Sequence, residues 1–283
     1  MRKPFMEELT AGVISGRPIM LITGDLGWGV VEEFAKRFPK NFINAGVAEQ
    51  NMMGMAAGMA AEGYHVFVYS IGNFSTFRCA EQIRNDVDYH NLPVTVVSVG
   101  GGLAYGAMGY SHHAVQDYAL IRSMPNMLIA APCDDMEATA CVRYLIENPQ
   151  PSYLRLGRGG EVQIHRPDCM PIVKPGEWVL VDKGNLINAD YTVVTTGTAA
   201  SIAMRLFPYA RQYTLPLWGM RYNRMQILKT GTAVFTSVED HLKAGGFGSW
   251  LQEAGCRVLI EALDPKVCGM VGTTEELLKA GGL

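Results

Sequence analysis

Residues 41–63 read NFINAGVAEQNMMGMAAGMAAEG, and this stretch decides how the rest of the chain is interpreted. Its small and apolar residues predict a helix over residues 47–62, with Glu49 near the start. One interpretation is structural, because the helix dipole favours an acidic residue there and methionines fill core gaps. The other is functional, because a carboxyl in a close-packed apolar seam has a raised pKa and can share a proton with a ligand nitrogen. The residues alone leave both interpretations open.

Short β-branched runs alternate with longer helical patterns around this stretch. Because the runs are apolar at nearly every position, they predict strands that are buried on both faces. These strands are expected over residues 18–23, 65–70, 93–99 and 127–131. Helices long enough for right-handed crossovers are expected over residues 47–62, 76–88 and 134–147. The pattern predicts an α/β fold with a doubly wound, mostly parallel sheet.

The alternation stops between residues 157 and 188, where Pro167, Pro171 and Pro175 interrupt regular structure. It then resumes, with strands expected over residues 191–196, 233–238 and 257–262 and helices over 199–209 and 246–254. We therefore expect a first domain over residues 1–165, a linker over 166–188 and a smaller α/β domain over 189–283. A chain of 283 residues has room for both, since single cores stop growing at about 250 residues.

Composition excludes several classes of protein. The formal net charge of -3 offers no basic surface for nucleic acid. No apolar run is long enough to span a membrane, and the start of the chain does not resemble a signal peptide, so a cytoplasmic protein is expected. The cysteines show no CxxC pair and no spacing to histidine that would indicate zinc, and we interpret them as reduced core thiols. They are Cys79, Cys133, Cys141, Cys169, Cys256 and Cys268.

The stretch around Glu49 resembles the FxNxGxAEQxMxGxAAG pattern of the transketolase family, in particular the C-terminal subunit of split transketolases. Further matching segments follow in order along the chain. They are AEQIRNDVDYHNLPV (80–94), GYSHHAVQDYALIRSMPNM (109–127), YLRLGR (153–158), TSVEDH (236–241) and GGFGS (245–249). The resemblance implies a pyrimidine-binding domain followed by a transketolase C-terminal domain, and thiamine diphosphate as cofactor.

The resemblance also implies roles for single residues. Glu49 matches the glutamate that bonds N1′ of the cofactor's aminopyrimidine and favours the tautomer that removes the C2 proton. Phe74 and Phe77 match aromatic residues that pack on that ring, although two phenylalanines at helical spacing can equally be core. Asp25 and Leu26 match an acidic residue near the cofactor and an apolar wedge under it.

The matched histidine of the substrate site is His112, which in the family bonds the substrate carbonyl oxygen and moves protons. His113 replaces what is commonly a glutamine, and a structural role is expected for it. Ser111 beside them does not indicate a serine hydrolase, because no GxSxG motif is present. In the same way, TGDLGWG at residues 23–29 lacks the spacing of a phosphate-binding loop.

The substrate end of the family pattern is only partly kept. Two phosphate-binding arginine positions are present, as Arg2 and Arg158. The serine and histidine positions are Gly29 and Gly100, and Met108 stands where the family has an acidic residue that senses a sugar hydroxyl. We therefore expect a modified or non-standard sugar rather than an ordinary pentose phosphate.

The diphosphate end of the family pattern is absent from this sequence. Family members hold the diphosphate through Mg²⁺ with a GDG motif and a later asparagine, and this sequence contains no GDG. No metal-binding residue is therefore expected in this chain. The resemblance implies an N-terminal partner subunit that supplies the metal site, and a heterotetramer that is active only when both subunits are present.

Three alternatives stay open. The β-subunit of a 2-oxo acid dehydrogenase shares the domain pair, although residues 83–91 and 121–127 are more like transketolase. Deoxyxylulose-phosphate synthase has a similar STF segment, but it is normally one chain with its own diphosphate domain. A non-catalytic regulatory subunit on the same fold is the third, since fold does not determine function.

Overall fold

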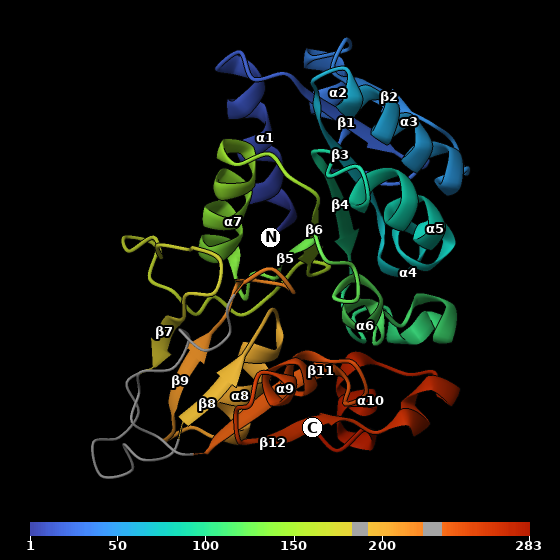
Figure 1. Cartoon of the computed structure of the whole chain (residues 1–283). Coiled ribbons are helices and arrows are strands. Elements are labelled where there is room, and N and C mark those ends of the chain that lie inside the picture. Colours follow the sequence, from blue (N-terminus) through green and yellow to red (C-terminus); the bar gives the residue numbers. More distant parts are fainter. Residues whose placement is uncertain (183–191, 223–233) are drawn as a thin grey trace.

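The computed structural model describes residues 1–182, 192–222 and 234–283, and Figure 1 shows two sheets, each with helices packed against it. The first sheet has seven strands in the order β10-β5-β6-β4-β3-β1-β2. All of its neighbouring strands are parallel except β10, which is antiparallel to β5. The strands are β1 (Ile19–Thr23), β2 (Phe42–Asn44), β3 (His65–Ile71), β4 (Val94–Val99), β5 (Leu128–Ala130), β6 (Ser152–Leu156) and β10 (Leu217–Trp218).

Side chains of this sheet alternate between two cores, as a continuous apolar run requires. In β1, Ile19 and Leu21 pack with helices α1 (Arg2–Ile14) and α7 (Asp135–Glu147) on one face. Met20 and Ile22 pack on the other face with α3 (Glu49–Ala61). Each fully buried aliphatic side chain stabilises the fold by about 1.5–3 kcal/mol, so both faces contribute. The prediction of a doubly wound sheet is confirmed.

The first domain also contains several short helical segments that connect the strands. They are α2 (Glu32–Arg37), α4 (Gly72–Ser75), η1 (Phe77–Cys79), α5 (Ala80–Gln82), η2 (Ile83–Asp88), η3 (Gly106–Met108), η4 (Tyr110–His112) and α6 (Asp117–Ile121).

The helix predicted over residues 76–88 is confirmed in part, because residues 77–88 are helical but do not form one regular α-helix. The chain there passes through a 3₁₀ turn, a short α segment and a π-helix. The buried hydroxyl of Thr76 donates to the carbonyl of Gly72, and Thr76 has non-helical backbone angles. Thr76 therefore separates α4, which contains Phe74, from η1, which contains Phe77. The two rings do not share one helix face.

The second sheet has five strands in the order β12-β11-β8-β9-β7, parallel except for β7. The strands are β7 (Val179–Asp182), β8 (Thr192–Thr195), β9 (Arg211–Thr214), β11 (Phe235–Leu242) and β12 (Val258–Leu263). The helical segments are α8 (Ala199–Leu206), α9 (Phe247–Glu253), η7 (Pro265–Gly269) and α10 (Thr274–Ala280). In the described part of the chain no helix has the length and apolarity that a membrane crossing requires.

The predicted linker over residues 166–188 needs a correction. Its end is not irregular, because β7 lies within it and pairs with β9 at the edge of the second sheet. The chain also returns to the first sheet after β9, where Leu217 and Trp218 of β10 pair with Ala130 and Ile129. The predicted boundary at residues 188 and 189 lies outside the described residues.

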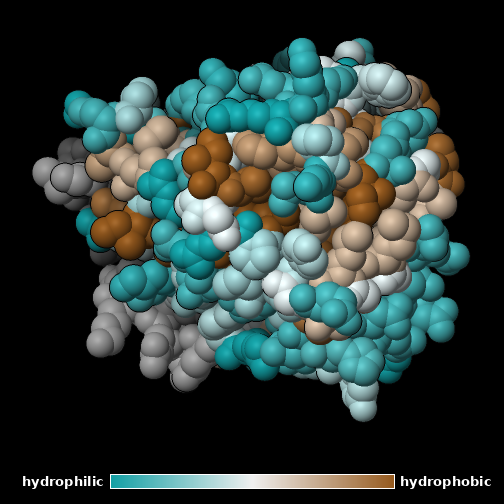
Figure 2. Space-filling view, turned by 90° about the horizontal axis from the view of Figure 1, so that it is seen from above, coloured by the Kyte–Doolittle hydropathy of each residue, from teal (hydrophilic) through white to brown (hydrophobic). Residues whose placement is uncertain are grey.

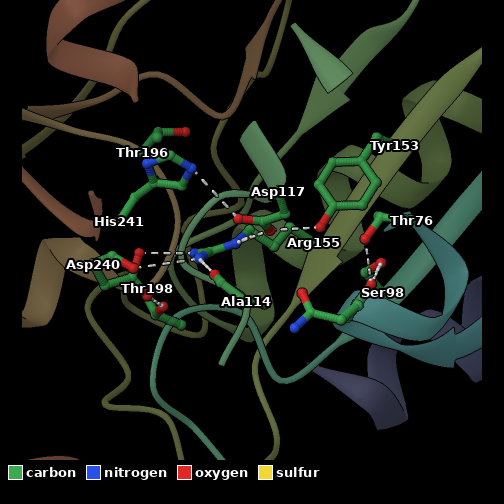
Figure 3. Close-up of polar contacts among 12 residues, drawn as sticks. Thr76, Ser98, Ala114, Asp117, Tyr153, Arg155, Thr196, Thr198, Asp240 and His241 are labelled. Carbon is green, nitrogen blue, oxygen red and sulfur yellow. Dashed lines mark hydrogen bonds and ion pairs between the residues drawn. The ribbon is translucent and has the colours of Figure 1, made fainter. Parts of the chain in front are cut away.

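A buried arginine connects the two halves of the molecule (Figure 3). Arg155 of β6 bonds Asp117 through Nε at 2.7 Å and Asp240 of β11 through Nη1 at 2.8 Å. Its Nη2 donates to the carbonyl of Ala114 at 2.9 Å, and Tyr153 also donates to Asp117 at 2.6 Å. The Arg155 side chain is only 2% exposed. Because nearly every donor is satisfied, this contact fixes the second sheet against the first.

Candidate active site

Five of the residues singled out from the sequence follow the carboxyl ends of parallel strands. Asp25 follows β1, Glu49 follows β2, Phe74 follows β3, Gly100 follows β4 and Arg158 follows β6. Parallel strands end at the same edge of a sheet, and ligands bind at that edge in open α/β folds. The topology therefore places residues that are up to 133 positions apart, Asp25 and Arg158, along one edge of the sheet.

Glu49 is the first residue of α3 and its side chain is only 7% exposed. Its Oε1 accepts a hydrogen bond from Nη1 of Arg78 at 2.8 Å. The carboxyl lies at a hollow of about 630 Å³ that Val47, Phe77 and Arg78 also line. The expected apolar seam is therefore only partly apolar, because a cation holds the carboxylate.

The two phenylalanines take different positions in the site. Phe77 is 46% exposed and lines the hollow beside Glu49. Phe74 lies under Arg78, whose guanidinium carbon is 4.0 Å from the centre of the Phe74 ring. The Phe74 ring also contacts His112, with ring centres 5.1 Å apart. Phe74 thus connects the glutamate and histidine sides of the site.

His112 is half-buried at the end of η4, and its Nδ1 lies 2.9 Å from Oγ of Ser111. Burial lowers the pKa of His112, and the charge of Arg78 and the neighbouring His113 lower it further. The imidazole is therefore mostly neutral near pH 7 and can either accept or donate a proton. His113 is fully buried and bonds the carbonyl of Gly106, which agrees with the structural role expected for it.

Gly100 follows β4 with a φ of +82°, and a β-carbon at this position would overlap the ring of Tyr105. Tyr105 in turn lies between His112, with ring centres 6.1 Å apart, and Arg158, whose guanidinium carbon is 5.1 Å from the Tyr105 ring centre. An aromatic ring thus fills the space beside position 100. Met108 is 60% exposed on η3, two residues before η4.

Arg2 and Arg158 lie on opposite sides of one glycine turn. Arg2 lines a pocket of about 680 Å³ together with Gly29 and the turn at Gly159 and Gly160. Arg158 and the same turn line a second pocket, of about 430 Å³, between the two sheets. The structure therefore brings the arginines near each other, but neither lines the hollow at Glu49.

Asp25 has the left-handed backbone conformation, with φ of +58°. The side chain of Asn44 holds it there, because its amide donates to Oδ1 of Asp25 at 3.1 Å and its oxygen accepts from the Asp25 N–H at 3.0 Å. Leu26 is fixed by Thr23, whose hydroxyl donates to the Leu26 carbonyl at 2.7 Å. Asp25 and Leu26 are thus held in place at the end of β1.

Sequence reasoning missed two residues of the site, Arg78 and Tyr105. Arg78 directly follows the GNFSTF segment, so an ionisable residue next to a quoted motif was an available signal. Tyr105 lies in a glycine-rich loop, and its position depends on the loop conformation, which the sequence pattern did not indicate.

One group of three side chains in the described part of the chain could hold a metal ion, namely Cys133, Glu137 and His165. It lies at the start of α7 and contains none of the predicted site residues. His165 bonds Asp134, and Glu137 already accepts from the N–H of Cys133 and from the Thr214 hydroxyl. These bonds account for the group as a structural contact between α7, residue 165 and β9.

Comparisons with known proteins agree with this geometry. Residues 1–160 match the family model described as transketolase, pyrimidine binding domain. One subunit of the apulose-4-phosphate transketolase of Phocaeicola vulgatus is 30% identical over 89% of this chain and 82% of its own length. A protein of Methanocaldococcus jannaschii described as a transketolase C-terminal section is 32% identical over 100% of this chain and 92% of its own length.

A solved structure described as a split gene transketolase in an inactive β4 tetramer superposes with a TM-score of 0.81. It is 28% identical, and the match covers 100% of this chain and 93% of that one. The 1-deoxy-D-xylulose-5-phosphate synthase of Syntrophotalea carbinolica is 32% identical, but this chain spans only 40% of its length. The chain belongs to the transketolase family.

Proposed function

We propose that the chain is the C-terminal subunit of a two-chain, thiamine-diphosphate-dependent transketolase, which transfers a two-carbon ketol unit from a ketose to an aldose. The observation that carries this proposal is Glu49, a buried carboxylate that borders an open hollow at the carboxyl edge of the first sheet. Phe74, Phe77 and His112 lie on the same edge, which supports a role for the whole group rather than for one residue.

The residues fit one end of the cofactor. Glu49 can hold a proton at a ring nitrogen of the aminopyrimidine, and Phe74 and Phe77 offer aromatic surfaces to the same ring. Of the described residues that line the hollow, none besides Glu49 is a carboxylate that could bind Mg²⁺. The diphosphate and its metal would accordingly be held by another chain.

When bound, thiamine diphosphate supplies the carbon nucleophile that takes up the two-carbon unit. The protein residues would orient the ring and control protons. Glu49 would share a proton with the ring nitrogen. His112, kept neutral by its lowered pKa, would exchange a proton with a substrate oxygen.

The proposed partner is an N-terminal subunit with the diphosphate-binding domain, in a heterotetramer. Two relatives are named as one part of a larger enzyme, the first as a subunit and the second as a C-terminal section, and this chain covers most of each. Figure 2 shows apolar residues gathered on one face with hydrophilic residues around them. Trp28, Val47 and Phe77 are large hydrophobic residues that are exposed in the single chain. Exposed apolar surface of this kind is typical of protein interfaces.

The proposed substrate is a sugar that differs from an ordinary pentose phosphate. The Tyr105 ring fills the space next to Gly100, and Met108 presents a thioether rather than a carboxylate. Gly100 and Met108 thus offer no hydrogen-bonding side chain at positions where the family has a histidine and an acidic residue. Comparing turnover of xylulose 5-phosphate with turnover of branched or otherwise modified ketose phosphates tests this part of the proposal, and full activity with ribose 5-phosphate as acceptor would contradict it.

The main proposal is tested by co-purifying the chain with its partner subunit and measuring ketol transfer with Glu49→Ala and Glu49→Gln. We expect kcat to fall by about 10²–10⁴-fold, the usual contribution of a proton-transfer group. Glu62→Gln, at the exposed opposite end of α3, is the matched control and should keep full activity. Robust activity of the chain without its partner, or of the Glu49 variants, would refute the proposal.

A further inference from the structure

Arg78 makes two contacts at once in the candidate site. Its Nη1 donates to Oε1 of Glu49 at 2.8 Å, and its guanidinium carbon lies 4.0 Å from the centre of the Phe74 ring. These are a carboxylate oxygen and an aromatic ring that the proposed function assigns to the aminopyrimidine of the cofactor. One side chain of the protein therefore occupies two of the surfaces that the ligand would need.

The chemistry of the two groups is also similar. A guanidinium is a planar N–C–N system that donates N–H bonds in its plane and stacks on aromatic rings with its face. An aminopyrimidine with a proton at a ring nitrogen is likewise planar and donates N–H bonds from an amidine-like edge. A carboxylate beside an aromatic ring can therefore accept either group in the same manner.

We propose that Arg78 is a built-in occupant of the aminopyrimidine site, which pairs with Glu49 until thiamine diphosphate displaces it. This inference rests on the proposed function, because it uses the same carboxylate. While Arg78 is in place, Glu49 is fixed and its charge is compensated, so the chain carries no unpaired buried carboxylate at this site before the enzyme is assembled.

The surroundings of Arg78 allow such an exchange. The Arg78 side chain is 49% exposed, and within the described residues Glu49 provides its hydrogen bond. Arg155, by contrast, is 2% exposed and bonds two carboxylates and a carbonyl. The Arg78 guanidinium is half-exposed and is held by one hydrogen bond and one ring contact, so a ligand that replaces both contacts can displace it.

When Arg78 competes with the cofactor, the apparent dissociation constant equals the intrinsic one divided by the fraction of molecules in which the site is free. The measurement is calorimetric titration of thiamine diphosphate, with Mg²⁺ present, into the chain assembled with its partner subunit. We expect Arg78→Ala to lower the dissociation constant by about 3- to 30-fold, the range of a weak ion pair plus a ring contact. Arg78→Lys keeps the charge but loses the planar stacking, and an intermediate value is expected.

Arg84→Ala is the matched control, because Arg84 is exposed on the same segment and bonds its neighbour Asn85. It should leave the dissociation constant unchanged. In a Glu49→Gln background the Arg78→Ala substitution should have a smaller effect, since the pair is already weakened. Equal or weaker binding by Arg78→Ala would overturn the inference.

Different results would contradict the proposed function and the inference on Arg78. If Glu49→Gln abolishes ketol transfer but Arg78→Ala leaves cofactor affinity unchanged, Glu49 has its proposed role and Arg78 is not an occupant of the site. If Glu49→Gln remains fully active, the proposed function itself is wrong, and with it the inference on Arg78.

Discussion

Two arginine ion pairs show how differently the same interaction is used in this molecule. At the junction of the two sheets, Arg155 is buried between Asp117 and Asp240, and both carboxylates are at most 7% exposed. At the carboxyl edge of the first sheet, Arg78 is half-exposed and contacts one carboxylate oxygen of Glu49. The first pair has enough partners to offset the cost of burying its charges, and it holds the architecture.

The pair of Arg78 and Glu49 has one hydrogen bond and one ring contact, so a ligand can replace Arg78 there. A ligand that donates a hydrogen bond to Glu49 can replace Arg78, which then turns to water, while Glu49 keeps a partner at the hollow. The comparison indicates that the domain junction is the rigid part of the molecule and that the edge with Glu49 is the part where a ligand can replace protein contacts. The following changes test each side of this difference.

The largest effect on stability is expected from Arg155→Met. The substitution roughly keeps the volume but leaves Asp117 and Asp240 buried without their cation, which destabilises folded proteins by about 3–5 kcal/mol. Urea unfolding measures the change. Arg166→Met, which removes an exposed ion pair with Asp168, should have no measurable effect. An Arg155→Met protein as stable as the wild type would show that the junction is not held by this network.

A smaller effect is expected from Gly100→Ala at the site edge. The added methyl group would overlap the Tyr105 ring, and the alanine would have to keep a backbone φ of +82°. Together these effects should lower the free energy of unfolding by about 2–4 kcal/mol. Gly29→Ala separates the two causes, because its φ is +75° but nothing lies within 4 Å of the added carbon. It should cost about 1 kcal/mol. Equal losses in the two variants would mean that Tyr105 does not pack where the structure places it.

The smallest effect is expected from His165→Gln, and it depends on pH. Burial opposes the charge on His165, but the Asp134 hydrogen bond and the charge of Glu137 outweigh burial and raise the pKa of His165 above its usual 6.5. A raised histidine pKa stabilises the folded state below about pH 6.5, and this stabilisation is lost as pH rises through the folded pKa. The difference in unfolding free energy between wild type and variant should be full below about pH 6.5 and should shrink as the pH rises above that value. Parallel profiles would contradict the assignment.

Much of the fold could be predicted because its strands are continuous apolar runs. β1, β3, β4 and β5 lie within about one residue of their expected ranges, since residues buried on both faces have no polar interruptions. Elements with weak local patterns were missed. β10 has two residues and pairs with a distant strand, and residues 77–88 form 3₁₀, α and π segments in place of the one helix expected over residues 76–88.

The candidate site divides in a similar way. Glu49, Phe74 and His112 belong to segments with a recognisable family pattern, and the parallel topology brings those segments to one edge. Arg155 and Asp240 are 85 positions apart, and no local pattern relates them. The pairing of Arg78 with Glu49 depends on the irregular turn between residues 76 and 79. Such contacts follow from tertiary structure and cannot be obtained from periodicity.

The central claim, that Glu49 controls proton transfer on thiamine diphosphate, is tested most directly by hydrogen–deuterium exchange at the cofactor's C2 atom. The exchange rate is measured by quenched-flow NMR in the assembled two-chain protein, without any sugar, for wild type, Glu49→Gln and Glu62→Gln. We predict that exchange slows by at least about 10²-fold in Glu49→Gln and is unchanged in Glu62→Gln. Equally fast exchange in all three proteins would contradict the account and favour a regulatory role for this subunit.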